Sequence, residues 1–201
     1  MHPNRAFQTS DSDEILAFVA ARAFAHLFTA SDAGLFVAHV PVIVADGRVR
    51  FHVAKRNRIA DHLDGRPVLI SLTARDGYQS ANWYATDDQV PTWHYEAAEV
   101  EGIATRLADA ELVEFLDRLS DRMEQLYSPE APWTRAKMEP GAFEAMTRAI
   151  VGFEVAPSAL RGTRKFNQHK ASADRAATIA GQQGVGRGDI VAAIEEMTRD
   201  G

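Results

Sequence analysis

The sequence predicts an α+β fold, an antiparallel β-barrel with peripheral helices, and two observations support this prediction. Short runs of β-type residues follow one another between residues 25 and 107, and two junctions between them carry Asp-Gly, a dipeptide typical of two-residue hairpin turns, at Asp46-Gly47 and Asp76-Gly77. The helical patterns are inserted among these runs instead of alternating with them, which disfavours a parallel nucleotide-binding sheet. We therefore expect strands that are joined mostly by hairpins and that close into a barrel.

The first half of the chain combines a helix with six strand-like runs. The helix is predicted at residues 11–24, where Ile15 and Val19 fall at helical spacing after a capping pattern. The strands are predicted at residues 25–30, 34–45, 47–55, 66–74, 78–85 and 91–107. A short helix at residues 57–63 interrupts them.

The second half begins with the clearest helix, at residues 109–127, which has one apolar stripe. A short helix that carries Phe143, Met146 and Ile150 follows, and then a returning strand at residues 151–160. Two further helical patterns, between residues 172 and 197, are separated by GQQGVGRG. A phosphate-binding loop follows a strand and ends in Gly-Lys-Ser/Thr, whereas this segment follows a helical pattern and lacks that ending. We therefore expect a turn between helices there.

The composition is that of one globular domain, with 46% hydrophobic and 25% charged residues among 201. We assign residues 1–170 to the barrel and residues 171–201 to a helical appendage of the same domain. No stretch reaches the roughly 18 consecutive apolar residues of a membrane span, and the first residues lack the apolar core of a secretory signal. The chain has no cysteine, which excludes a disulfide framework. We therefore expect a cytoplasmic protein.

The charge balance disfavours bulk electrostatic binding of nucleic acid, because 22 Lys and Arg residues stand against 28 Asp and Glu residues, a net charge of −6. The seven histidines lack the spacing of a metal site, and no serine lies in a Gly-x-Ser-x-Gly nucleophile elbow. We therefore expect no metal centre and assign no catalytic residue.

Three segments are candidates for binding. In FHVAKRNRIADHL a strand runs into a helix start that carries Lys55, Arg56, Asn57 and Arg58, which indicates either a phosphate site or a solvated basic turn. Aromatic residues are interleaved with polar ones between residues 78 and 95, as core filling or as the wall of a cavity for a planar aromatic ligand. The third segment, residues 161–170, carries four cations: Arg161, Arg164, Lys165 and Lys170. Three interpretations are open for them: a phosphate site, a contact with nucleic acid, or a solubilising turn.

Three stretches of the sequence together resemble the PaiB-like family, which is described as FMN-binding proteins and negative transcriptional regulators. They are HVAKRNRIADHL, VPTWHYEAAEVEG and RKFNQHKASADRAATIAG, and further similar stretches extend the resemblance over nearly the whole chain. The family's middle motif runs Val-Pro-Thr-Trp-Asn-Tyr and its late motif Lys-Leu-Ser-Gln-Asn-Lys. This sequence matches the late motif at Lys165 and Gln168 and departs from the two motifs at His94, Phe166, Asn167 and His169.

The resemblance implies a split β-barrel related to pyridoxamine-phosphate oxidases and flavin reductases, usually a homodimer with FMN near the subunit interface. It implies that the flavin phosphate is bound at the strand-to-helix junction, by residues drawn from His52, Lys55, Arg56, Asn57 and Arg58. Trp93, His94 and Gln168 are further candidates for lining the site, from the second subunit. His94 and Asn167 differ from the family's motifs. These differences affect the expected hydrogen bonds to the flavin ring more than the expected contacts with the flavin phosphate.

Three hypotheses about function follow. The first is a homodimeric FMN-binding protein that acts as a flavin-dependent oxidoreductase, in which the flavin supplies the chemistry. The second is a transcriptional regulator with a sensory or vestigial flavin site that contacts DNA through Arg161, Arg164, Lys165 and Lys170. The third is a haem-binding split-barrel protein with histidine as axial ligand.

Overall fold

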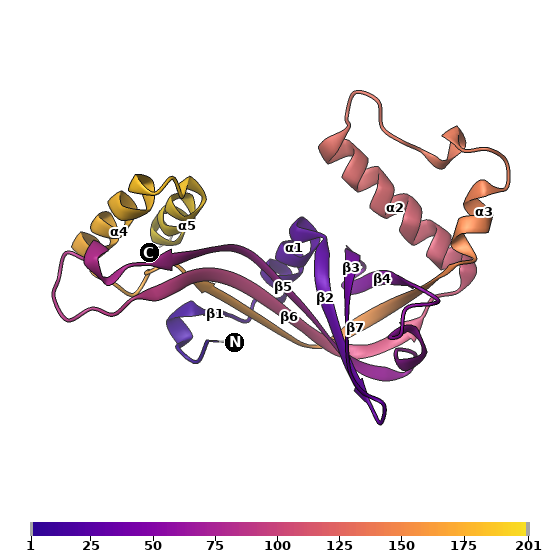
Figure 1. Cartoon of the computed structure of the whole chain (residues 1–201), viewed down its shortest axis with the longest axis horizontal. Helices are drawn as coiled ribbons and strands as arrows, with labels where there is room; N and C mark the ends of the chain where they lie inside the picture. The colour runs from indigo at the N-terminus through magenta and orange to yellow at the C-terminus, as the bar shows by residue number, and fades with distance from the viewer. Residues whose placement is uncertain (1, 200–201) are drawn as a thin grey trace. The chain divides into compact units, whose positions relative to one another are not determined.

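The computed structural model describes residues 2–199, and its strands form one antiparallel sheet. The strand order is β1-β7-β4-β3-β2-β5-β6, and a further pairing of β7 with β6 closes the sheet into a barrel, as predicted. The chain divides into two compact units. Unit 1 comprises Met1–Asp11, Thr73–Ala98 and Arg161–Gly201, and unit 2 comprises Ser12–Leu72 and Glu99–Leu160. Figure 1 labels the α-helices and β-strands of both units.

The elements of the first half are the short helix η1 (Arg5–Phe7), β1 (Gln8–Thr9), α1 (Ser12–Arg22), β2 (Phe24–Ser31), β3 (Gly34–Ala45), β4 (Arg48–Ala54), η2 (Ala60–His62), β5 (Arg66–Gln79), η3 (Ala81–Trp83) and β6 (Thr92–Arg106). Those of the second half are α2 (Asp109–Tyr127), η4 (Arg135–Lys137), α3 (Ala142–Thr147), β7 (Ile150–Lys165), α4 (Ser172–Gly184) and α5 (Gly188–Arg199).

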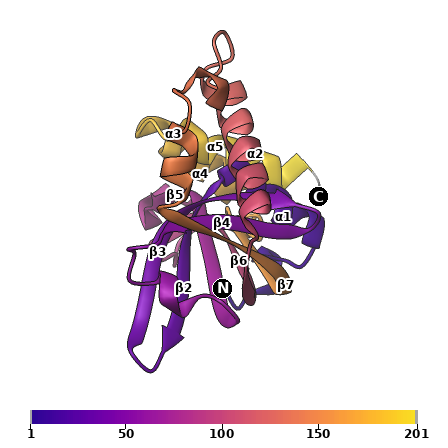
Figure 2. The same ribbon diagram turned by 90° about the vertical axis from the view of Figure 1, so that its right-hand side faces the viewer.

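Unit 2 contains the closed part of the barrel. Phe51 on β4 lies opposite Phe153 on β7, both are buried, and their rings stack with centroids 5.7 Å apart. The barrel closes where β6 meets β7: Ser158 donates a hydrogen bond to the carbonyl oxygen of Glu101, and a side chain at Gly102 would lie 2.5 Å from the carbonyl oxygen of Ala156. Helix α2 packs on β3 and β4 (Figure 2).

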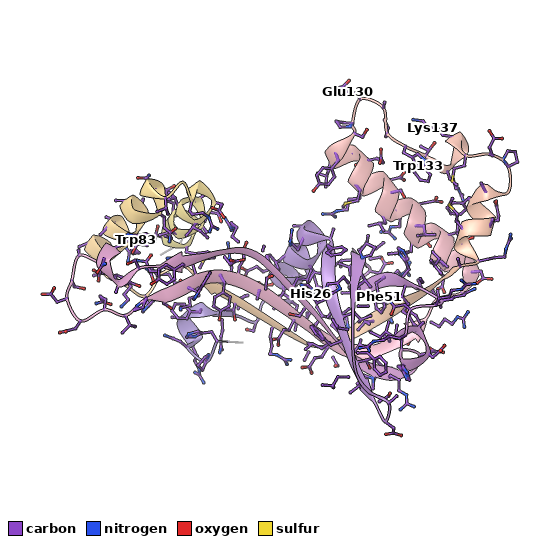
Figure 3. The ribbon with its side chains drawn as sticks, viewed as in Figure 1. His26, Phe51, Trp83, Glu130, Trp133 and Lys137 are labelled. Carbon is purple, nitrogen blue, oxygen red and sulfur yellow. The ribbon has the colours of Figure 1, made fainter. Side chains whose placement is uncertain are left out.

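Unit 1 contains the C-terminal ends of β5 and β7, the N-terminal end of β6, and helices α4 and α5. The two helices lie side by side (Figure 1). Its core combines Phe166 with Ile190, Ala193 and Ile194 from α5. Trp83 packs closely against α4 (Figure 3). A Cβ atom added at Gly181 of this helix would lie only 2.5 Å from the indole ring.

Most predicted elements are confirmed, including the Asp46-Gly47 turn, where both residues have positive φ angles of 52° and 71°. The predicted Asp76-Gly77 turn and the separate strand at residues 78–85 are wrong. Strand β5 runs without a break from Arg66 to Gln79, and Gly77 faces α5, where a Cβ atom would lie 3.0 Å from Ile190. Close helix packing, and not a turn, requires this glycine.

Two smaller predictions are corrected in the same way. The helix expected at residues 57–63 is only the three-residue turn η2, and Ile150, expected beside Met146 in a helix, begins β7. The glycine-rich segment connects α4 to α5, as predicted, with Gly186 at a positive φ of 75°. Among the described residues, no helix is long and apolar enough to cross a membrane.

Candidate functional site

The turn that follows β4 presents the basic segment Lys55–Arg58 at the surface of unit 2. Its backbone is fixed by hydrogen bonds from the Lys55 N–H to Ala149 O and from the Asn57 N–H to Ala54 O, each 2.9 Å long. Ile59 is fully buried, and its N–H donates to the Asn57 side-chain oxygen at 3.2 Å. The apolar anchor therefore holds the turn in place while the basic side chains stay exposed.

The charges of this turn are available for a ligand. Lys55 and Arg56 are exposed, and no acidic side chain within residues 2–199 forms an ion pair with either of them. Arg58 is held more firmly, because its guanidinium carbon lies 5.2 Å above the Phe36 ring and the group donates to Leu35 O at 3.4 Å. An ammonium group, guanidinium groups and the Asn57 amide nitrogen are donors that a phosphate accepts, so this donor set fits the phosphate of FMN.

The structure places His52 apart from these exposed donors. Its ring packs edge-on against Phe115 of α2, with centroids 5.6 Å apart. Burial lowers the pKa of His52, so the neutral imidazole is favoured there. Its Nδ1 atom has no hydrogen-bond partner in the described part of the chain. His52 therefore offers less to an anion than the four residues of the turn.

The other predicted residues, Trp93, His94 and Gln168, belong to unit 1. Trp93 and His94 lie on opposite faces of β6: Trp93 is 55% exposed and contacts Tyr78, whereas His94 is fully buried. Burial lowers the pKa of His94 to about 4. Its ring stacks on Phe166 at a centroid distance of 6.0 Å.

Gln168 also fixes the local structure of unit 1. Its Oε1 accepts the Phe166 N–H at 2.8 Å, and its Nε2 donates to Ala6 O at 3.0 Å. His94 and Gln168 thus meet around Phe166. The Gln168 side chain is fully engaged, whereas Nδ1 of His94 has no hydrogen-bond partner among the described residues. Trp93 is the member of this group that presents an open surface to a ligand.

The cations of residues 161–170 are half-buried instead of forming an exposed row. Arg164 pairs with Glu196 at 3.5 Å and with Glu96 at 3.8 Å. Lys165 donates to Thr92 Oγ1 at 2.5 Å, and Lys170 donates to Gln89 Oε1 at 2.6 Å. These contacts all lie within unit 1.

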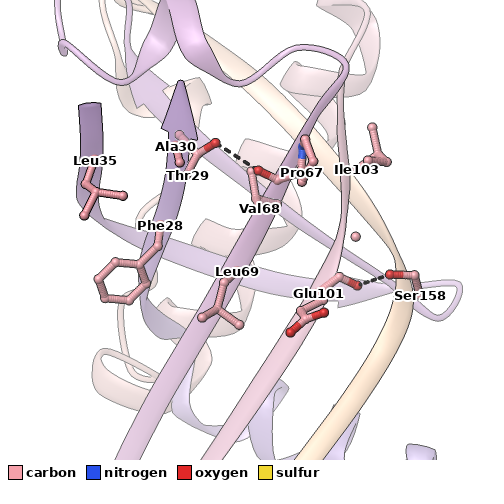
Figure 4. Close-up of a pocket in the computed structure, with 11 residues that line it drawn as sticks. Phe28, Thr29, Ala30, Leu35, Pro67, Val68, Leu69, Glu101, Ile103 and Ser158 are labelled. Carbon is pink, nitrogen blue, oxygen red and sulfur yellow. Dashed lines mark hydrogen bonds between the residues drawn. The ribbon is translucent and has the colours of Figure 1, made fainter. Parts of the chain in front are cut away.

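Sequence reasoning missed an apolar face in unit 2. On the outward side of β2 and β3, Phe24, Phe28, Leu35 and Val37 are between 39% and 82% exposed. A cavity of about 400 Å³ adjoins this face, lined by Phe28, Leu35, Val68, Leu69 and Ile103 among others (Figure 4). The signal was present in the sequence, because both alternating faces of residues 24–37 carry apolar side chains, whereas one solvated face should be polar.

Comparison with known proteins agrees with this fold. A family model described as "Putative FMN-binding domain" matches residues 1–158. The protein named Protease synthase and sporulation protein PAI 2, from Bacillus subtilis, is 23% identical over 184 residues, which cover 87% of this chain and 85% of that protein.

Two solved structures have the same fold. The FAD and haem binding protein from Mycobacterium smegmatis is 17% identical with a TM-score of 0.60, over 79% of this chain and 73% of that one. The flavocytochrome Anf3 from Azotobacter vinelandii is 17% identical with a TM-score of 0.62, over 82% and 72%. The split β-barrel, the resemblance to PaiB-like proteins and FMN as the family's cofactor are thereby confirmed, and the chain belongs to the family of FMN-binding domains.

Proposed function

We propose that the chain binds FMN with its phosphate at the turn Lys55–Arg58 and acts as a homodimeric flavin-dependent oxidoreductase. The observation that carries this proposal is the pair of exposed cations, Lys55 and Arg56, which have no acidic partner within residues 2–199. Two unpaired cations on adjacent residues repel each other, and a doubly charged phosphate relieves that repulsion.

Each residue of the turn has a separate role in this proposal. Lys55 supplies a point charge, and Arg56 supplies a planar fork that matches two phosphate oxygens. The Asn57 side chain uses its oxygen to cap Ile59, which leaves its amide N–H groups for the ligand. Arg58 is oriented by Phe36 and Leu35 and so loses little side-chain entropy on binding.

The reaction chemistry belongs to the cofactor: a bound flavin supplies hydride or electron transfer. The contribution of the chain is binding, orientation and exclusion of water. In the homodimer, Trp93 of the second subunit, with its exposed ring, is a candidate to contact the flat flavin ring.

A second copy of the chain would cover the apolar face of β2 and β3. Exposed apolar side chains that gather on one sheet face are typical of interfaces, and here they adjoin the cavity shown in Figure 4. Arg58 donates to the backbone of Leu35, a residue of this face, so the phosphate turn lies next to the proposed interface. A flavin bound at the turn would then lie close to the second subunit.

Haem binding is the second candidate. On the same apolar face His26 lies directly opposite His39, with ring centroids 4.9 Å apart, so imidazole ligands and apolar surface occur together. A regulator that contacts DNA through residues 161–170 is less favoured, because those cations are half-buried and the DNA backbone needs exposed cations.

One spectrum separates these candidates. Protein purified without added cofactor should show the visible bands of a flavin, or should develop a saturable flavin spectrum when FMN is added at micromolar concentration. A Soret band on haem addition with no response to FMN would favour the second candidate. No response to either ligand would contradict both.

A further inference from the structure

A group of basic side chains surrounds the buried ring of Phe7 in unit 1. The ring of His2 lies 4.7 Å from the Phe7 ring, and that of His169 lies 4.9 Å from it, both edge-on. The Lys165 ammonium group lies 6.0 Å from the same ring centroid. Three basic groups therefore share one apolar neighbour.

The turn after β7 carries a second lysine, Lys170, which follows His169 in the sequence and whose charge acts on the His169 imidazole. Asn167 adopts a positive φ of 62°, and the Lys170 N–H donates to Asn167 O at 2.9 Å, which folds the chain back on itself. The Lys170 ammonium group lies 5.1 Å from the Tyr84 ring centroid. The turn thus places Lys165 and Lys170 on the two sides of His169 along the chain.

Neither lysine has a carboxylate partner within residues 2–199. Lys165 bonds to the hydroxyl of Thr92 and Lys170 to the amide oxygen of Gln89, and both acceptors are uncharged. The carboxylate of Asp174, at the start of α4, is engaged by the Thr86 hydroxyl and by two backbone N–H groups of the same loop.

The cations are electrostatically unbalanced as a result. Burial lowers the pKa of Lys165. Burial, followed by repulsion from Lys170, Lys165 and His2, lowers the pKa of His169. Half-buried cations are normally paired with anions, because desolvation without a counter-charge is costly.

We propose that Lys165, His169 and Lys170 form a binding site for a small oxyanion, a phosphate or carboxylate group, built from residues of unit 1. This site uses none of the residues assigned to the flavin phosphate, and it does not depend on FMN binding. The half-buried position of both ammonium groups suits a small anion better than the backbone of duplex DNA, which needs exposed cations.

Calorimetric titration with inorganic phosphate and with citrate tests the proposal and separates the two anion classes. The chain should bind one of them saturably, and Lys165→Gln and Lys170→Gln should each weaken that binding by about tenfold, the loss expected for one charge-assisted hydrogen bond. Arg5→Gln, which removes an exposed cation of unit 1, should have no effect. Equal affinity in all variants, no saturable binding, or binding of duplex DNA alone would overturn the proposal.

An NMR titration of the unmodified chain gives a readout that does not depend on the variants folding. Bound phosphate or citrate should raise the pKa of the His169 imidazole, because it supplies the missing negative charge. The same rise should persist in Lys55→Gln, which separates this site from the flavin turn. An unchanged pKa of His169 at saturating anion would contradict the proposal.

Discussion

The Nε2 atom of His94 lies 3.0 Å from Oε1 of Gln79, and neither side chain is exposed to solvent. Because a carbonyl oxygen only accepts, His94 donates from Nε2, while the Gln79 amide nitrogen donates to Ser80 O at 3.0 Å. The pair joins β5 to β6 in unit 1, and Phe166 covers the imidazole ring. Protonation of this ring would leave a cation in an apolar environment.

The buried imidazole predicts acid sensitivity. Its pKa is lowered to about 4, chiefly by burial, so the stability that depends on the neutral form is complete above the unfolded pKa of about 6.5 and falls as the pH drops below it. Between neutral pH and about pH 5, the free energy of unfolding should fall by about 2 kcal/mol more in the unmodified chain than in His94→Asn. Urea unfolding at both pH values measures this difference. An equal fall in both proteins would contradict the assignment.

Two glycines of α4 provide a matched pair for testing helix packing. A Cβ atom at Gly181 would lie 2.5 Å from the Trp83 ring, whereas one at Gly184 would meet nothing within 4 Å. Gly181→Ala should therefore lower the free energy of unfolding by about 1–3 kcal/mol. Gly184→Ala should be neutral or slightly stabilising, because alanine favours helix. Urea unfolding followed by tryptophan fluorescence distinguishes the two. Equal stability of the two variants would show that Trp83 does not pack on this helix.

The ion pairs of Arg75 connect β5 and β6 to α5 within unit 1. Its guanidinium contacts Glu96 and Glu196, both at 2.9 Å, and these carboxylates raise its pKa. Arg75→Met leaves the buried carboxylate of Glu96 with Arg164, at 3.8 Å, as its one remaining ion-pair partner within residues 2–199. This variant should lower the free energy of unfolding by about 3 kcal/mol.

The exposed pair of Arg48 with Glu154 serves as the control for Arg75. The Arg48 side chain is 48% exposed, so Arg48→Met should lower the free energy of unfolding by less than about 1 kcal/mol. Thermal and urea unfolding compare both variants with the unmodified chain. Similar losses for the two would contradict a special role for the Arg75 network.

The apolar face of β2 and β3 predicts the oligomeric state. Leu35 is 82% exposed in the single chain, and Leu35→Glu would bury a carboxylate in the proposed interface without a partner. Sedimentation should show a dimer for the unmodified chain and a monomer for this variant. Leu126→Glu, at a residue 60% exposed on α2, should leave the dimer intact. A monomeric unmodified chain would contradict the proposed interface.

Local sequence signals predicted most of the fold, but the turn predicted at Asp76-Gly77 is wrong because a contact with a distant residue decides the structure there. Asp46-Gly47 and Asp76-Gly77 are the same dipeptide, but only the first forms a turn. Gly77 is required by its contact with Ile190, more than a hundred residues later, and no local pattern reveals such a contact.

The candidate site shows the same division between local and distant contacts. The basic turn at Lys55–Arg58 could be predicted, because its residues are neighbours in the sequence. The pairing of Lys165 with Thr92 and of Lys170 with Gln89 could not, because the turn after β7 must first meet the loop before β6. Alternation along β6 places His94 and Trp93 on opposite faces, but it does not show which face is buried. The contact of His94 with Gln79 depends on the unbroken strand β5.

Comparison of FMN with riboflavin, which lacks the phosphate, tests whether the turn Lys55–Arg58 binds the flavin phosphate. If Lys55 and Arg56 bind the phosphate, the unmodified chain should prefer FMN, and Lys55→Gln together with Arg56→Gln should weaken FMN binding by about a hundredfold while riboflavin binding changes little. Lys137→Gln, which removes a cation of the loop between α2 and α3, should change neither affinity. Equal weakening of both flavins, or an unchanged preference for FMN in the double variant, would contradict the placement of the phosphate at this turn.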